Sequence, residues 1–103
     1  MISSNVTKIS AVFQIPLIEL GARLGVESAV LLDSSMGGDR QLVRRIHHLA
    51  GIADLVLRHL GTEEIPRWAR IPLPAFDGLS FLDTISAGRE IEVAAGLRDA
   101  LSW

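Results

Sequence analysis

The sequence predicts an all-α protein, and three observations support this fold class. Apolar residues recur at steps of three and four along most of the chain, no segment alternates apolar and polar residues over the length of a strand, and capping residues, glycines and prolines divide the chain into short helices. The 103 residues, 49% of them hydrophobic, are enough for one ordinary folded domain. Because so short a chain buries only a limited core, its apolar surplus favours an oligomer or a partner-binding surface.

Three helices are expected in the first third of the chain. The first spans 6–15 and ends before Pro16, because proline lacks an N–H and disfavours helix in the residue before it. Pro16 then opens the second helix, which ends at Gly25. Ser28 caps a short third helix, and the serine- and glycine-rich residues 34–38 end it.

Residues 17–36 resemble a helix-turn-helix. Gly21 lies where the two helices would cross, and Gly25 can adopt the positive φ that the turn requires. The outward side of the second helix would carry Glu27 and Asp33 and no basic residue, and these acids would face phosphates or base edges if DNA were bound there. We therefore expect a helix-turn-helix-like N-terminal half in which the helix pair serves the architecture.

The longest predicted helix is capped by Asp39 and ends at Gly61. Its apolar residues recur at alternating steps of four and three, which is the pattern of a helix that faces another helix. A second apolar row lies beside the first, so this long central helix is either the centre of the domain or also half of a dimer interface. We expect a homodimer whose interface contains the first row: Leu42, Ile46, Leu49, Ala53 and Val56.

Three arginines begin the central helix and are the nearest positive charges to the helix-turn-helix. Arg40, Arg44 and Arg45 could clamp the backbone phosphates of operator DNA. The alternative explanation is an ordinary solvated helix start.

The composition excludes several kinds of chemistry. The chain has no cysteine, and therefore no disulfide, thiolate metal site or cysteine nucleophile. His47 and His48 would point about 100° apart on a helix and His59 would lie about 16 Å further along, so one metal ion cannot join them. No nucleophile, base and oxyanion hole come together in the pattern. We expect no cofactor, no metal and no enzymatic activity.

The C-terminal half contains shorter elements. A helical turn carries Trp68, which we expect to pack beneath the proline-rich segment 72–74 and to join the two halves of the chain. Ser80 and Asp83 form a capping box for a brief helix, and a last helix spans 89–101.

The C-terminal half contains Arg67-Trp68, then Pro72-Leu73-Pro74-Ala75-Phe76-Asp77-Gly78-Leu79-Ser80-Phe81-Leu82-Asp83, and then Gly88-Arg89-Glu90-Ile91-Glu92-Val93 followed by Leu97. Together these residues resemble the toxin-binding domain of Xre/MbcA/ParS-type antitoxins. The likeness covers about residues 61–101, and the preceding helix-turn-helix and long helix fit the N-terminal half of that family. The resemblance implies a helix-turn-helix-like and dimerising half over 1–61 and a toxin-binding half over 62–103, sharing a core.

The resemblance also implies a function, that of a type II antitoxin. Its partner would be a RES-type toxin that consumes NAD, and the C-terminal helix and tail of this chain would block the toxin's active site. The implied toxin-binding residues are Phe81, Asp83, Arg89, Glu90, Glu92, Val93, Leu97, Leu101 and Trp103. The net charge of −3 over 62–103 would complement a pocket that accepts a pyrophosphate. For Trp103, anchoring a partner and folding back over the core are both consistent with the sequence.

The alternative function is a helix-turn-helix DNA-binding transcriptional autoregulator without a toxin partner. Neither function requires a membrane. The sequence shows no signal-peptide pattern and no apolar run that approaches the ~18 residues of a membrane span, so we expect a cytoplasmic protein.

Overall fold

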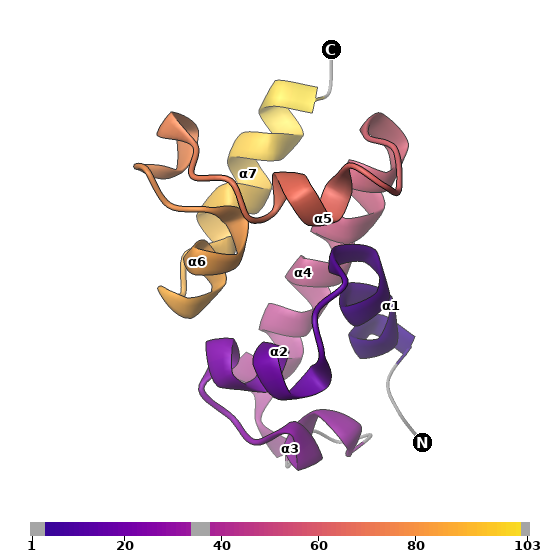
Figure 1. Ribbon diagram of the computed structural model, residues 1–103. Coiled ribbons are helices and arrows are strands. Elements are labelled where there is room, and N and C mark those ends of the chain that lie inside the picture. The colour runs from indigo at the N-terminus through magenta and orange to yellow at the C-terminus, as the bar shows by residue number, and fades with distance from the viewer. Residues whose placement is uncertain (1–3, 34–37, 102–103) are drawn as a thin grey trace.

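The computed structural model describes residues 4–33 and 38–101, whose regular secondary structure is all helix, without a strand (Figure 1). The predicted all-α class is confirmed. The elements in chain order are α1 (Ser4–Phe13), α2 (Leu17–Leu24), α3 (Ser28–Leu32), α4 (Arg40–His59), α5 (Ile65–Trp68), the 3-10 helix η2 (Pro74–Phe76), α6 (Phe81–Ser86) and α7 (Glu90–Leu101). None of the helices described is both long and apolar enough to cross a bilayer.

Helix α4 is the axis of the fold, and α1 and α7 pack along it. Its start is set by Asp39, whose carboxylate accepts hydrogen bonds from the backbone N–H groups of Gln41 and Leu42 at 3.0 and 3.1 Å. The apolar row predicted to form a dimer interface is buried inside the chain itself, each side chain being at most 3% exposed: Leu42, Ile46, Leu49, Ala53 and Val56. That prediction is corrected, because a second copy cannot contact side chains already covered by α1 and α7.

The α2–α3 pair has the close approach that the sequence indicated. Gly25 adopts a φ of 79° at the end of α2, in the left-handed region that favours glycine. A Cβ atom on Gly21 would lie 2.7 Å from the carbonyl oxygen of Val26, so only glycine permits this crossing. Ser28 does not cap α3 but is its first residue, preceded by Glu27 in extended backbone.

The chain between α5 and α6 contains a short 3-10 helix, η2, which Pro74 opens. Asp77 and Gly78 follow with φ of 56° and 81° and turn the chain back. The Ser80 cap is confirmed, because its hydroxyl accepts the backbone N–H of Asp83 at 3.1 Å.

One hydrophobic core runs through both halves of the chain. Phe81 is fully buried at its centre, with ring centroids 4.8 Å from Phe13 of α1 and 5.4 Å from Trp68 of α5. Arg70 adds a polar link by donating hydrogen bonds to the carbonyl oxygens of Phe13 and Gln14 at 3.1 Å. Segments 1–61 and 62–103 therefore meet across a continuous packed interior.

Candidate functional site

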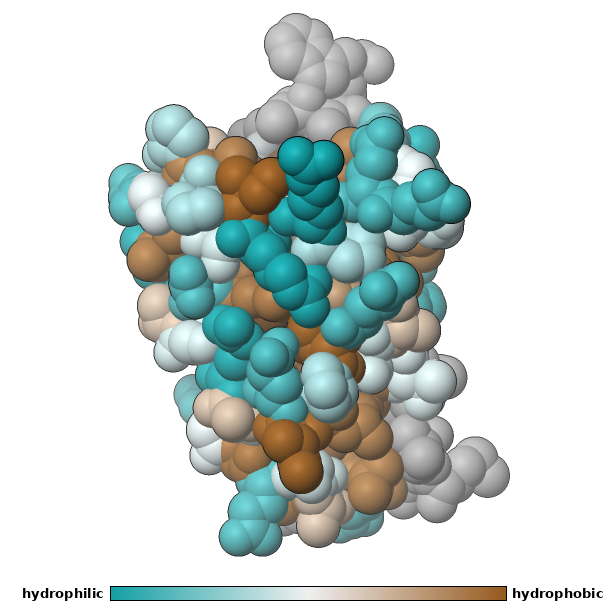
Figure 2. Space-filling model, viewed as in Figure 1, coloured by the Kyte–Doolittle hydropathy of each residue, from teal (hydrophilic) through white to brown (hydrophobic). Residues whose placement is uncertain are grey.

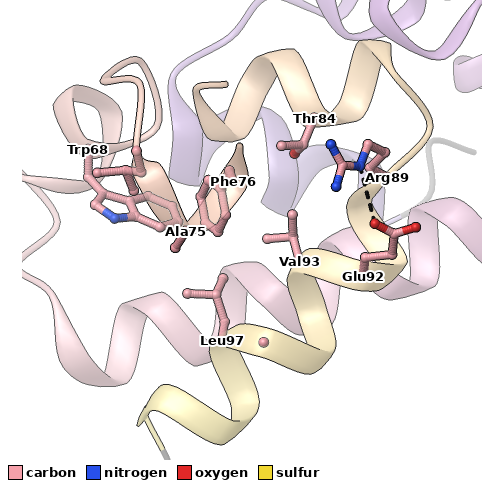
Figure 3. A pocket seen from close by; sticks show the side chains of 10 residues that line it. Trp68, Ala75, Phe76, Thr84, Arg89, Glu92, Val93 and Leu97 are labelled. Atoms are coloured by element: carbon pink, nitrogen blue, oxygen red, sulfur yellow. Dashed lines mark hydrogen bonds and ion pairs between the residues drawn. The ribbon is translucent and has the colours of Figure 1, made fainter. Parts of the chain in front are cut away.

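A groove of about 260 Å³ lies between α7 and the segment that contains α5 and η2; we call it the α7 groove (Figure 3). Its lining is mainly apolar and consists of Trp68, Leu73, Ala75, Phe76, Thr84, Arg89, Glu92, Val93, Gly96 and Leu97. In Figure 3, Val93 and Leu97 project from α7 toward Phe76 across the groove. An apolar concavity with a few polar groups at its edge is the usual form of a binding site.

The wall opposite α7 is held by local contacts. The rings of Trp68 and Phe76 meet edge to face, with centroids 6.2 Å apart and an interplanar angle of 84°. The N–H group of Leu73 donates to the carbonyl oxygen of Leu79 at 3.1 Å, and the N–H group of Gly78 donates to the carbonyl oxygen of Leu73 at 3.0 Å. These bonds close the loop over residues 73–79, which we call the η2 loop. The wall is therefore formed before any partner binds.

Arg89 forms the polar end of the α7 groove. Its guanidinium donates to the carboxylates of Asp77 at 2.7 Å and Glu92 at 3.1 Å, and so joins the η2 loop to α7. The hydrogen bonds with Asp77 and then Glu92 raise the pKa of Arg89 above its ordinary value. The end of the groove therefore presents an ion-paired cation flanked by two exposed acids.

The structure places the predicted toxin-binding residues in different parts of the fold. Arg89, Glu92, Val93 and Leu97 line the α7 groove, and Leu101 is the last residue of α7. Trp103 lies outside the described residues.

Asp83 is exposed on α6 and is not among the residues that line the groove. Arg23 of α2 donates to its carboxylate at 3.3 Å. Hydrogen bonds from the Ser80 side chain and from Arg23 hold the pKa of Asp83 below its usual range. Asp83 is therefore accessible and also joins α6 to α2.

Two predicted contacts are wrong. Phe81 is fully buried in the core, and Glu90 is only 1% exposed, so neither can touch a partner. Glu90 instead pairs with Arg45, one of the arginines predicted to contact DNA. Arg45 also donates to the carbonyl oxygens of Ile85 at 2.8 Å and Leu24 at 3.3 Å, which ties α4 to α2, α6 and α7.

The other predicted DNA contacts, Arg40 and Arg44, are exposed on α4. Neither forms an ion pair within the described part of the chain.

Sequence reasoning missed six residues that line the α7 groove, and one of them gave a signal. Gly96 interrupts a helix where glycine costs about 1 kcal/mol relative to alanine. A Cβ atom there would meet nothing within 4 Å in the part of the chain that the structure describes, so no contact there requires the glycine. Without a side chain at position 96 the groove is deeper. The other five are Leu73, Ala75 and Phe76 from the segment around η2, Trp68 from α5 and Thr84 from α6, which only the folded chain brings together.

Over residues 4–33 and 38–101, no group of three or more His, Asp or Glu side chains is placed to hold a metal ion.

Comparisons with protein-family models, with curated proteins and with solved structures each gave no match for this chain. The arrangement of the α7 groove can bind an apolar surface with a charged edge.

Proposed function

We propose that this protein is the antitoxin of a type II toxin–antitoxin system and acts by binding, without catalysis. It binds a RES-type, NAD-consuming toxin through the α7 groove and the outward side of α7, and blocks the toxin's active site. On this proposal the protein works in the cytoplasm beside its toxin.

The observation that carries the proposal is an accessible apolar surface along α7. Ala95 and Gly96 are exposed and Leu97 is half-buried at the groove, while Ile91, 47% exposed, lies on the other side of α7 beside Arg44 and Arg45. Small residues at the surface of a helix let a partner's backbone approach closely, while the apolar floor supplies the area that is removed from water. Such a patch rimmed by charged side chains is typical of protein–protein interfaces.

The charge around this surface supports the same partner. Asp77 and Glu92 are exposed at the groove and are balanced by the single cation Arg89. A toxin pocket that accepts a pyrophosphate is electropositive, so a net acidic rim would speed association.

The alternative function, a helix-turn-helix regulator, depends on α3 as the reading helix. The five residues of α3 include no cation, and the exposed residues at its surface include Ala29 and Leu32. Figure 2 shows hydrophobic residues gathered at the end of the molecule that α2 and α3 form. Ser28 is the one polar residue among the five of α3, too few for the set of base contacts that direct readout needs.

Point substitutions test the antitoxin proposal better than truncation of α7, because Glu90, Val93 and Ala94 of α7 are buried in the fold. Gly96→Gln fills the α7 groove, and Gly51→Gln makes the same change in α4; both positions have open space around the added Cβ. The wild type and each variant are co-expressed with the product of the adjacent reading frame, and growth rescue and co-purification are measured.

Gly96→Gln should lose both rescue and co-purification while its thermal midpoint is unchanged or higher, and Gly51→Gln should retain both. A neighbouring protein that is harmless and does not bind, or a complex that survives Gly96→Gln unchanged, contradicts the proposal.

A further inference from the structure

The cations whose side chains the structure describes fall into two groups. The first group bonds to carboxylates or carbonyl oxygens within the chain: Lys8, Arg23, Arg45, Arg70 and Arg89. The second group has no such partner within the part of the chain that the structure describes: Arg40, Arg44, Arg58 and Arg67. Three of these four unpaired arginines lie on α4.

These three arginines share one side of α4. A helix turns about 100° and rises about 1.5 Å per residue, so Arg40 and Arg58 point the same way about 27 Å apart. Arg44, His47 and Gly51 lie within about 40° of that direction, as does Asp54, which is half-buried and paired with Lys8. The other five residues, Arg40, Arg44, His47, Gly51 and Arg58, are exposed on the side opposite the buried row. We call these five residues the α4 ridge.

Folding does not account for the composition of the α4 ridge. Arg40 is the first residue of α4 and Arg44 follows one turn later, where the helix dipole disfavours cations, and no acid stands in the first turn. Gly51 interrupts the helix, although a Cβ atom there would meet nothing within 4 Å. The two arginines at the start of α4 and Gly51 all reduce the stability of the helix. They leave positive charge and helix backbone accessible to a ligand.

The surroundings of the α4 ridge offset only part of its charge, through Asp39 beside Arg40 and Asp54 on the same side of α4. Helix α4 contains four arginines and one aspartate, a net charge of +3 in a chain whose total is −2. That aspartate, Asp54, is paired with Lys8 of α1 at 3.0 Å, and α1 contains no acid. Glu90 of α7 is buried against Arg45. The positive potential over the ridge therefore persists.

A groove of about 450 Å³ runs beside the α4 ridge, between α4 and Ala94 of α7. The rest of its lining consists of His47, His48, Gly51 and Arg58, the acid Asp54, and the apolar Ile52 and Leu55. The ridge itself has no apolar side chain, whereas the centre of a protein–protein interface needs apolar and aromatic groups. Phosphate backbones are bound by arginines and other donors without an apolar core.

We infer that the α4 ridge binds the sugar–phosphate backbone of nucleic acid, independently of base sequence. This goes beyond the proposed antitoxin function, because toxin binding uses the α7 groove on the other flank of α7. The groove at Gly51 gives the strand room beside the ridge, and the α2–α3 pair takes no part in reading bases.

Fluorescence anisotropy of the full chain with labelled 20-nucleotide duplexes and single strands tests this inference. Three arginine–phosphate contacts predict a slope of about −3 in a plot of log affinity for a duplex against log salt concentration. Two duplexes of unrelated sequence should bind alike. The affinities for duplex and for single strand are compared, and the tighter of the two is the form of nucleic acid that the ridge prefers.

The double variant Arg44→Ala with Arg58→Ala should bind about tenfold or more weakly at low salt, with a slope near −1. Arg67→Ala, which removes an unpaired arginine outside α4, is the matched control and should bind as the wild type does. Circular dichroism confirms that each variant is folded.

Absence of wild-type binding at low salt would overturn the inference, as would a double variant that binds like the wild type. Equal displacement of the duplex by poly-glutamate of the same charge would also overturn it, since the ridge would then accept any polyanion. So would a strong preference for one duplex sequence that the double variant retains.

Discussion

Arg44 and Arg45 are neighbours in the sequence and have opposite environments. Arg44 is exposed on the α4 ridge, whereas Arg45 points inward to buried Glu90 and to two backbone carbonyl oxygens from α2 and α6. One residue step turns a helix by about 100°, which is enough to move a side chain from solvent to the interior. The difference shows that residue type alone does not distinguish a structural arginine from one available for binding.

The largest expected effect separates these two arginines. Arg45→Ala leaves the Glu90 carboxylate buried without its partner, and breaking a buried pair in this way costs about 3 kcal/mol or more of unfolding free energy. Arg44→Ala removes an exposed side chain and should change stability by less than about 0.5 kcal/mol. Urea denaturation of both variants measures the difference.

The double variant Arg45→Met with Glu90→Leu serves as the control for that comparison. Replacing both charges by apolar groups leaves no charge uncompensated, so much of the stability should return. Equal stability of the two single variants would show that the Arg45–Glu90 pair does not join α4 to α7.

Two glycines extend the comparison to the helix backbone. Gly21→Ala should destabilise by about 2 kcal/mol, because the new Cβ would overlap the Val26 carbonyl oxygen at 2.7 Å. Gly51→Ala has open space and should stabilise by about 0.5–1 kcal/mol through helix propensity. Thermal or urea unfolding measures the sign of the stability change for each variant. A destabilising Gly51→Ala would mean that the fold itself, and not an open binding surface, requires this glycine.

The smallest effect concerns the exposed pair of Arg23 and Asp83. Because the Ser80 and Arg23 hydrogen bonds depress the pKa of Asp83 in the folded state, the carboxylate contributes stability at neutral pH and loses it as the pH falls through that lowered pKa. Asp83→Asn should therefore flatten the loss of stability below about pH 4, with little change at pH 7 because the pair is solvent-screened. Thermal midpoints measured across this range check it, and an unchanged acid profile would contradict it.

Local signals in the sequence predicted the parts of the fold that depend on neighbouring residues. The Asp39 and Ser80 caps, the positive φ of Gly25 and the close approach at Gly21 each follow from a residue type and its immediate surroundings. The all-α class follows from the same kind of evidence, because periodicity reports which side of each helix is buried.

Features that depend on distant residues were not predictable in the same way. Arg45 and Glu90 are 45 residues apart, and each has the appearance of a surface charge on its own helix. Phe81 stands at a helix start that resembles a partner-binding motif, but it fills the space between Phe13 and Trp68. The apolar row of α4 indicated a facing helix without indicating whether that helix belongs to the same chain.

Hydrogen–deuterium exchange on the complex with the adjacent gene product tests the central claim most directly. The account predicts that binding slows exchange at the amides of α7 around Gly96 and of the η2 loop, and leaves the amides around Gly51 of α4 unchanged. Protection confined to α2–α3 or to α4, or no protection and no complex, would contradict the assignment of the α7 groove as the toxin-binding site.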